Sequence, residues 1–269
     1  MALSLIDNRR TKVAALIASR NRENLLCKRS IFSISKQSLQ PDLIIIVNDG
    51  QSFSVKSTKT LEKLCQMSDL KILENKHSKG VSGAWNHGID YLLRNNFTGF
   101  VAILDDDDEW DSDHLDLNLK VAKTEKANVV ISGLRIHGQK RNLITKFTEH
   151  DFLVGNPGWH GSNTFIDLDL LESIGSFTEG LVSTNDRDLA IRVIRSLKAR
   201  IAFTRVWTAT WHLDSKDSLS TPRSTEKLLG LKQFWDIYGS EMTISQHGLF
   251  FDRAFNLFGF SRTEITKYE

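Results

Sequence analysis

The chain has 269 residues, of which 40% are hydrophobic and 25% are charged, and its formal net charge is +2. This length suits one large domain, and the near-neutral charge argues against a dedicated nucleic-acid-binding protein. The two cysteines are isolated, which suits a reducing compartment. The first segment lacks the apolar core of a signal peptide, and no apolar run comes near about 20 residues. These features predict a cytoplasmic protein.

Strand and helix patterns alternate through the first part of the chain. A strand, a helix and a strand joined by short loops predict a βαβ unit and a parallel sheet. The sequence predicts strands at 12–18, 43–47, 70–73 and 100–104, helices at 23–36, 61–67 and about 81–94, and a loop over 51–60.

The second part is less regular and ends in a tail rich in phenylalanine. Core closure is the favoured role of that tail, with contact to a bilayer as the alternative. We expect three segments, namely two halves of one domain (1–110 and 111–215) and a helical extension (216–269). The pattern predicts helices at 114–127, near 168–174 and from 185, strands at 129–131, 165–166 and from 201, and loop with an edge strand over 132–163.

Four consecutive aspartates, Asp105 to Asp108, follow the strand at 100–104. Adjacent carboxylates repel one another, so such a run favours a hard divalent cation held by oxygen ligands. The carboxyl ends of strands in an open α/β sheet are also where ligands bind. The alternatives are a solvated acidic turn or a loop that takes Ca²⁺ for structure.

Five segments in order resemble the family 2 inverting glycosyltransferases with the GT-A fold. They are 15–22, 30–37, 44–50, 79–89 and 103–110, and the resemblance covers about residues 11–215. It implies an α/β fold with a mostly parallel central sheet and an acceptor-side subdomain. Residues 1–110 would form the nucleotide-sugar-binding half, and residues 111–215 the acceptor and catalytic half of the same domain. Three positions depart from the family pattern, namely Ala18, Asn48 and Trp85. Trp85 removes a cation that Lys79, His87 or Arg22 would have to replace.

The resemblance also implies a nucleotide-sugar donor. Asp49 would accept a hydrogen bond from the uracil or thymine edge, which points to UDP or dTDP; an Asp-Gly turn is its structural alternative. Solvation is the favoured role of Asp106. The donor-binding residues carried over from the family pattern are Ala18, Ser19, Arg22, Asp49, Gly80, Asn86, Asp105, Asp106 and Asp107.

The same pattern implies Mg²⁺ or Mn²⁺ at Asp107 and Asp108, with His212 as a third ligand or, equally, a hydrogen-bonded structural residue. It places the general base at Asp186, for which partnering a helix N-terminus is the alternative. Asp188 fits that alternative better. The loop 155–163 is expected to shape the donor-sugar and acceptor site, with Trp159 on a sugar ring or in the core.

The sequence therefore predicts a metal-dependent inverting glycosyltransferase that moves a sugar to a hydroxyl of a glycan, lipid-linked or protein acceptor. Membrane contact would be peripheral at most. One alternative is a sugar-nucleotide-binding protein without catalysis. A nucleotidyltransferase is less favoured, because the loop after the first strand lacks the glycines that grip phosphates.

Overall fold

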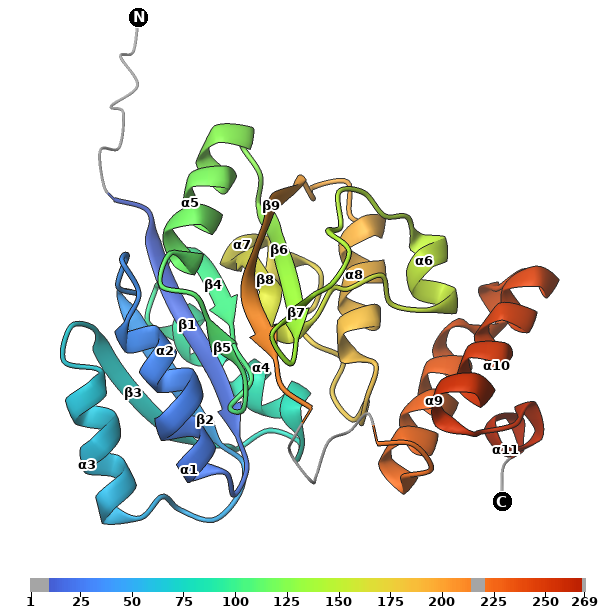
Figure 1. Ribbon diagram of the computed structural model, residues 1–269, viewed down its shortest axis with the longest axis horizontal. Helices are drawn as coiled ribbons and strands as arrows, with labels where there is room; N and C mark the ends of the chain where they lie inside the picture. The colour runs from blue at the N-terminus through green and yellow to red at the C-terminus, as the bar shows by residue number, and fades with distance from the viewer. Residues whose placement is uncertain (1–9, 214–220, 268–269) are drawn as a thin grey trace, which may run out of the picture.

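The computed structural model describes residues 10–213 and 221–267, which form a nine-stranded sheet between two layers of helices (Figure 1). The strand order is β3-β2-β1-β4-β8-β6-β9-β5, and β7 pairs with β6. The strands are β1 (Lys12–Ser19), β2 (Leu43–Asn48), β3 (Asp69–Glu74), β4 (Gly99–Ile103), β5 (Glu109–Trp110), β6 (Val129–Ile136), β7 (Gln139–Lys140), β8 (Thr164–Asp167) and β9 (Ile201–Trp211).

Strands β1 to β4 are parallel, as the βαβ pattern predicts. Strand β8 is antiparallel to both β4 and β6, while β6 and β9 are parallel to each other. Six of the nine strands thus run in one direction, and the expected α/β fold with a mostly parallel sheet is confirmed. The carboxyl ends of β1, β2 and β4 meet at one edge, where the acidic run begins.

The two faces of the sheet have separate cores. On one face, Leu16 and Ile45 pack with side chains of α4, α7 and α8; on the other, Ile17 and Ile46 pack with side chains of α2, α3 and α5. The longer helices are α3 (Val55–Leu64), α4 (Val81–Arg94), α5 (His114–Glu125), α8 (Asn185–Arg195), α9 (Thr225–Tyr238) and α10 (Ile244–Phe258), and the shorter ones are α1 (Glu23–Leu25), α2 (Ile31–Ser35), α6 (Glu149–Val154), α7 (Leu168–Ser173) and α11 (Arg262–Thr266).

The C-terminal helices lie beside α6 and α8 (Figure 1). Phe234, Phe250 and Phe251 are buried in the same core as α8, so much of the aromatic tail closes the core, whereas Phe255 is exposed. Within 10–213 and 221–267, no helix is long and apolar enough to cross a membrane.

Two helices were not predicted from the sequence. The expected loop 51–60 is helical from Val55, because Ser54 caps the helix by accepting from the Ser57 amide. Leu61 is the one residue of α3 that is buried. Helix α6 begins with a reciprocal cap between Thr148 and Asp151. Both helices are short of apolar periodicity, the signal on which the prediction depends.

Candidate active site

The acidic run forms the turn after β4. The Leu104 amide continues the strand by donating to Leu16, and the Asp108 amide then donates to the Asp105 carbonyl at 3.2 Å. The indole of Trp110 donates to the Ser162 carbonyl at 2.6 Å, which ties the end of the turn to the loop before β8. The turn is therefore held at both ends.

Asp106 is not solvated, so that interpretation is wrong. Its carboxylate is 5% exposed and accepts from Ser19 Oγ at 2.8 Å and Arg22 Nη1 at 3.2 Å. Arg22 also lies 2.8 Å from Asp107 Oδ2. Burial raises the pKa of Asp106 to about 6 although the Arg22 charge opposes this. Asp106 and Arg22 thus form a buried pair that fixes the loop after β1 against the acidic turn.

A π-helical turn, Leu26–Ser30, supports this turn from the other side. Arg29 Nη1 donates to the Asp107 carbonyl at 2.7 Å, and Ser30 Oγ donates to the Asp106 carbonyl at 3.3 Å. Such π-turns are frequent at functional sites because they redirect side chains.

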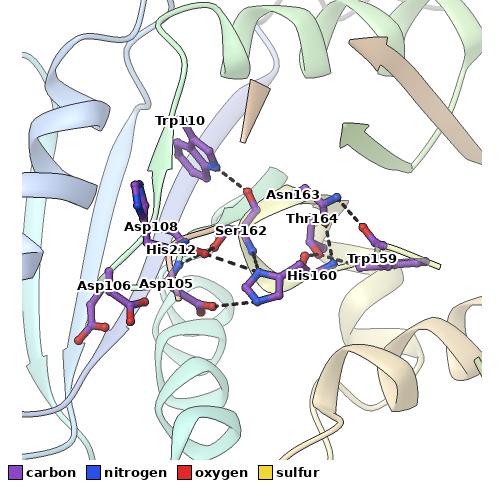
Figure 2. A network of polar contacts seen from close by, with 12 residues as sticks. Asp105, Asp106, Asp108, Trp110, Trp159, His160, Ser162, Asn163, Thr164 and His212 are labelled. Carbon is purple, nitrogen blue, oxygen red and sulfur yellow. Dashed lines mark hydrogen bonds and ion pairs between the residues drawn. The ribbon is translucent and has the colours of Figure 1, made fainter. Parts of the chain in front are cut away.

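Asp105, Asp108 and His160 form a cluster in which one ligand-type atom from each lies within 4.8 Å of the others (Figure 2). His160 Nε2 is 3.7 Å from Asp105 Oδ2, and His160 Nδ1 is 3.6 Å from Asp108 Oδ2. Ser162 Oγ donates to the fully buried Asp108 carboxylate and accepts from the Asp105 amide. Burial raises the pKa of Asp108 to about 7.

His160 was missed by the sequence reasoning, which placed it only within the loop 155–163. Burial lowers the pKa of His160, but Asp186, Asp105 and other nearby carboxylates outweigh that effect and raise it. The same loop puts Trp159 in the core, fully buried with its indole donating to Thr164 Oγ1, so core packing is the correct interpretation for Trp159.

Of the three predicted metal ligands, Asp108 lies in the cluster. The Asp107 carboxylate faces Arg22. His212 contacts the cluster through its backbone, whose amide donates to Asp108 Oδ1 at 2.9 Å, while its ring Nε2 lies 3.2 Å from Glu109 Oε1.

Asp186 lies in the first turn of α8 and faces this cluster. Burial raises the pKa of Asp186, while His160, Lys227 and the Gly161 amide act in the opposite direction. The structure therefore brings the predicted base next to the acidic turn, although 78 residues separate Asp186 from Asp108.

Asp188 has a different role. Its carboxylate is 2% exposed and accepts from Tyr238 at 2.7 Å and from Arg192 at 2.7 Å. The Tyr238 bond joins α8 to α9, and the Arg192 bond lies within α8, so Asp188 is a structural anchor. It lies in the first turn of α8 but does not cap that helix, whose N-cap residue is Thr184.

Of the predicted donor-binding residues, Asp49 lies at an open cleft of about 450 Å³ beyond β2 and β3, which Asn48 and Asn75 also line. Asp49 Oδ1 accepts from Asn75 Nδ2 at 2.6 Å, and Asp49 Oδ2 accepts from the Gly80 amide at 2.8 Å. Gly80 has a φ of 112°, which favours glycine, and it begins α4. Asp49 thus shapes the cleft, and each of its oxygens retains a second lone pair.

The remaining predicted donor residues lie on β1 and α4. Ala18 is half-buried on β1, next to the buried Ser19. Asn86 is turned away from the cleft, since it exchanges hydrogen bonds with the backbone of Phe177 and donates to Glu179 at 3.0 Å. Trp85, in place of the family's cation, is 2% exposed and packs against Phe177 with the ring centroids 4.6 Å apart and the ring planes tilted by 41°.

Comparisons with known proteins agree with this geometry. The profile of glycosyl transferase family 2 matches residues 15–190. The chain is 24% identical over 234 residues, 84% of this chain and 85% of the relative, to WfgD of Escherichia coli, a UDP-Glc:α-D-GlcNAc-diphosphoundecaprenol β-1,3-glucosyltransferase.

Solved structures share the fold. A 1–349 fragment of S. aureus TarS in complex with UDP-GlcNAc superposes with a TM-score of 0.65 at 16% identity, over 94% of this chain and 74% of that one. The mannosyltransferase PcManGT from Pyrobaculum calidifontis, in complex with GDP-Man and Mn²⁺, gives a TM-score of 0.58 at 15% identity, over 92% and 70% of the two chains. The chain belongs to glycosyl transferase family 2 and is a GT-A glycosyltransferase that uses a nucleotide-sugar donor.

Proposed function

We propose that the protein catalyses metal-dependent, inverting transfer of a sugar from a UDP-sugar, or a dTDP-sugar, to an acceptor hydroxyl. The observation that carries this proposal is the position of His160, which faces the Asp105 and Asp108 carboxylates and lies near Asp186. One small region thus offers ligand-type groups for a cation and a carboxylate suited to proton transfer.

The donor set of the cluster fits a divalent cation. Two carboxylates and an imidazole suit Mn²⁺, and the carboxylates alone suit Mg²⁺. Asp105, Asp108 and His160 would hold the ion, with Asp107 beside them. The bound ion would neutralise and orient the leaving diphosphate. Ser162 keeps the Asp108 carboxylate in place, and Arg22 adds positive charge beside Asp107.

The cleft beside Asp49 is the proposed nucleotide site. It opens at the carboxyl ends of β2 and β3, where ligands bind in sheets of this kind. The lone pairs left on the Asp49 carboxylate can accept the ring N–H of uracil or thymine. Ser19 donates to Asp106 in the acidic turn, and the Gly80 amide donates to Asp49 at the cleft. These contacts link the cleft and the acidic turn within residues 1–110, which supports that segment as the donor half.

Asp186 is the proposed general base. A carboxylate whose pKa is raised by burial binds a proton more readily than a solvated one, which suits it to take the proton of the attacking hydroxyl. Attack from the Asp186 side, with the leaving group held on the side of the acidic turn, would invert the anomeric centre.

The acceptor is proposed from the likeness to WfgD, whose name specifies a sugar linked through diphosphate to undecaprenol. By that likeness this chain would act on a lipid-linked glycan at a membrane surface. Residues 111–215 would then provide the catalytic half, and 216–269 an extension on the acceptor side.

Thermal unfolding with UDP, dTDP, GDP and CMP, each with and without Mn²⁺, tests the donor class, because a ligand that binds only the folded state raises the melting temperature. We expect a shift with UDP or dTDP that needs Mn²⁺. A shift with GDP alone would remove Asp49 from its proposed role, and no shift with any nucleotide would contradict the enzyme proposal.

A further inference from the structure

Three cationic side chains gather behind Asp186, on elements that are far apart in the sequence. Lys227 comes from α9, Arg253 from α10 and Arg187 from α8. Arg187 and Arg253 both lower the pKa of Lys227, so the three charges are close enough to repel one another. Asp186 is the nearby carboxylate that acts on Lys227 in the opposite direction.

The Arg187 guanidinium is hydrogen-bonded and packed within the protein. Its guanidinium donates to the carbonyls of Phe152 and Leu153, both at 2.8 Å, and lies 3.9 Å from the centre of the Phe234 ring. This side chain joins α6, α8 and α9, and its role is structural.

Lys227 is different. It is 7% exposed, and its ammonium group lies 4.3 Å from the centre of the Phe258 ring. Within residues 10–213 and 221–267, that ammonium makes no hydrogen bond and no ion pair. Burial, together with Arg187 and Arg253, lowers the pKa of Lys227 to about 8. A largely buried ammonium ion that lacks a hydrogen bond or ion pair costs free energy that a bound anion would offset.

Arg253 is the third cation of the cluster and lies beside the loop 155–163. Its side chain passes 3.7 Å from the point where a Cβ on Gly155 would lie, and it has no hydrogen-bond or ion-pair partner in the described part of the chain. Arg253 and Asp186 are each only partly buried, so each side chain keeps some contact with solvent.

The position of Lys227 is fixed by close packing of α9. A Cβ on Gly230, one turn further along, would lie 2.0 Å from Ser183 Oγ. Gln233, on the same face, accepts from the Val182 amide at 2.9 Å and donates to the Gly180 carbonyl at 2.7 Å. The loop before Asp186 and helix α9 therefore form one unit, with Lys227 facing the start of α8.

We infer that Lys227 and Arg253 bind a phosphate or diphosphate group of the acceptor, next to the hydroxyl that Asp186 deprotonates. Arginine and lysine side chains are the usual partners of phosphate oxygens, and two unpartnered cations suit an anion of two or more charges. This inference rests on the proposed function, and it gives the acceptor a chemical class, that of a sugar attached to a phosphate or diphosphate.

The test is calorimetric titration, without divalent metal, of the full-length protein with geranyl diphosphate, inorganic diphosphate and uncharged geraniol. We expect both diphosphates to bind, and Lys227→Met and Arg253→Gln each to weaken that binding by about 10-fold or more. Lys232→Met is the matched control, because Lys232 lies on the same helix and donates only to the Lys267 carbonyl at the surface. Lys227→Arg should restore binding and also shows whether the site tolerates substitution.

Binding of geranyl diphosphate no tighter than that of geraniol would overturn the inference, as would a Lys227→Met variant that binds like the wild type. Tighter binding of geranyl diphosphate than of inorganic diphosphate would identify a lipid-linked group; equal binding would identify the phosphates alone. The nucleotide-dependent thermal shift is a separate measurement. If it fails while the diphosphates still bind, the donor proposal is wrong and the anion site stands.

Discussion

His77 Nδ1 lies 2.8 Å from Glu179 Oε1, across 102 residues of sequence. The same carboxylate accepts from the Ser78 amide at 3.1 Å and from Asn86 at 3.0 Å. His77 lines the proposed nucleotide cleft, and Glu179 precedes the helix that carries Asp186. This contact joins the donor side of the site to the segment that positions the base.

Glu179→Gln should lower the free energy of unfolding by about 1 kcal/mol at pH 7, because hydrogen bonds to the ionised carboxylate are lost. Although desolvation raises the pKa of Glu179, hydrogen bonds from Ser78, Asn86 and His77 lower it to about 2. The stabilisation is therefore complete above pH 4.5 and is lost as the pH falls toward 2. Urea unfolding of the wild type and of Glu179→Gln at several pH values measures the difference in their free energy of unfolding. Glu172→Gln, at an exposed position on α7, is the control, and a difference that persists at pH 2 would contradict this account.

Asp186→Asn should reduce transfer by about 10²- to 10⁴-fold, the usual contribution of a general base. The nucleotide-dependent thermal shift should remain, since Asp186 lies outside the cleft beside Asp49. The substitution is nearly isosteric, and it removes the negative charge together with the ability to take a proton. Asp169→Asn, on the exposed side of α7, serves as the control. Transfer at the wild-type rate would place the base elsewhere.

His160→Ala should weaken Mn²⁺ binding by at least about 10-fold, since even residues that only support a metal ligand contribute this much. His212→Ala should have a smaller effect, because His212 contacts Asp108 through its backbone amide, which the substitution keeps. Titration of Mn²⁺ followed by electron paramagnetic resonance compares the two. If His212→Ala is the weaker binder, the cation lies on the Glu109 side of the turn.

His114 should make the protein less stable in acid. Its ring is fully buried, stacks on Trp110 with centroids 4.5 Å apart and lies 2.8 Å from Thr208 Oγ1. Burial lowers the pKa of His114 to about 3, so between pH 6.5 and 3 the unfolded chain binds a proton that the folded chain excludes. Stability is thus complete above pH 6.5 and declines as the pH falls.

The His114→Phe variant removes the titrating imidazole and keeps an aromatic ring that can stack on Trp110. The variant should be less stable than the wild type at pH 7.5, because Thr208 loses its partner, and the gap should narrow as the pH falls below 6.5. Chemical unfolding at pH 7.5, 6, 5 and 4 measures the gap. A gap that stays constant over this range would show that His114 does not titrate as its burial requires.

The sequence was sufficient to predict the structure where the signal lies within one short segment. The apolar run at 43–47 and the aspartates that end the strand at 100–104 identified the sheet and its functional edge, and Asp186 was found through the family pattern. Asp106 was misjudged because its partner, Arg22, lies 84 residues away. A run of like charges predicts a solvated turn unless a distant cation is known to reach it.

His160 and Lys227 had no usable local signal. His160 is a single histidine in a polar loop, and its importance comes from three acids supplied by two other segments. Lys227 looks like an ordinary surface residue of an amphipathic helix, but in the folded chain it is buried beside Phe258. Both depend on tertiary contacts, which periodicity and composition do not report.

The contact between Gly230 and Ser183 has an evolutionary consequence. Because α9 follows the last strand of the sheet, the residues proposed to lie beside the acceptor come from a stretch of gene separate from the one that supplies the proposed nucleotide cleft. Recombination or drift in that final stretch could then change what is glycosylated while leaving the activation of the sugar intact. Replacement of Gly230 would be disfavoured in every such descendant, since any side chain there would push α9 off the loop that carries Ser183.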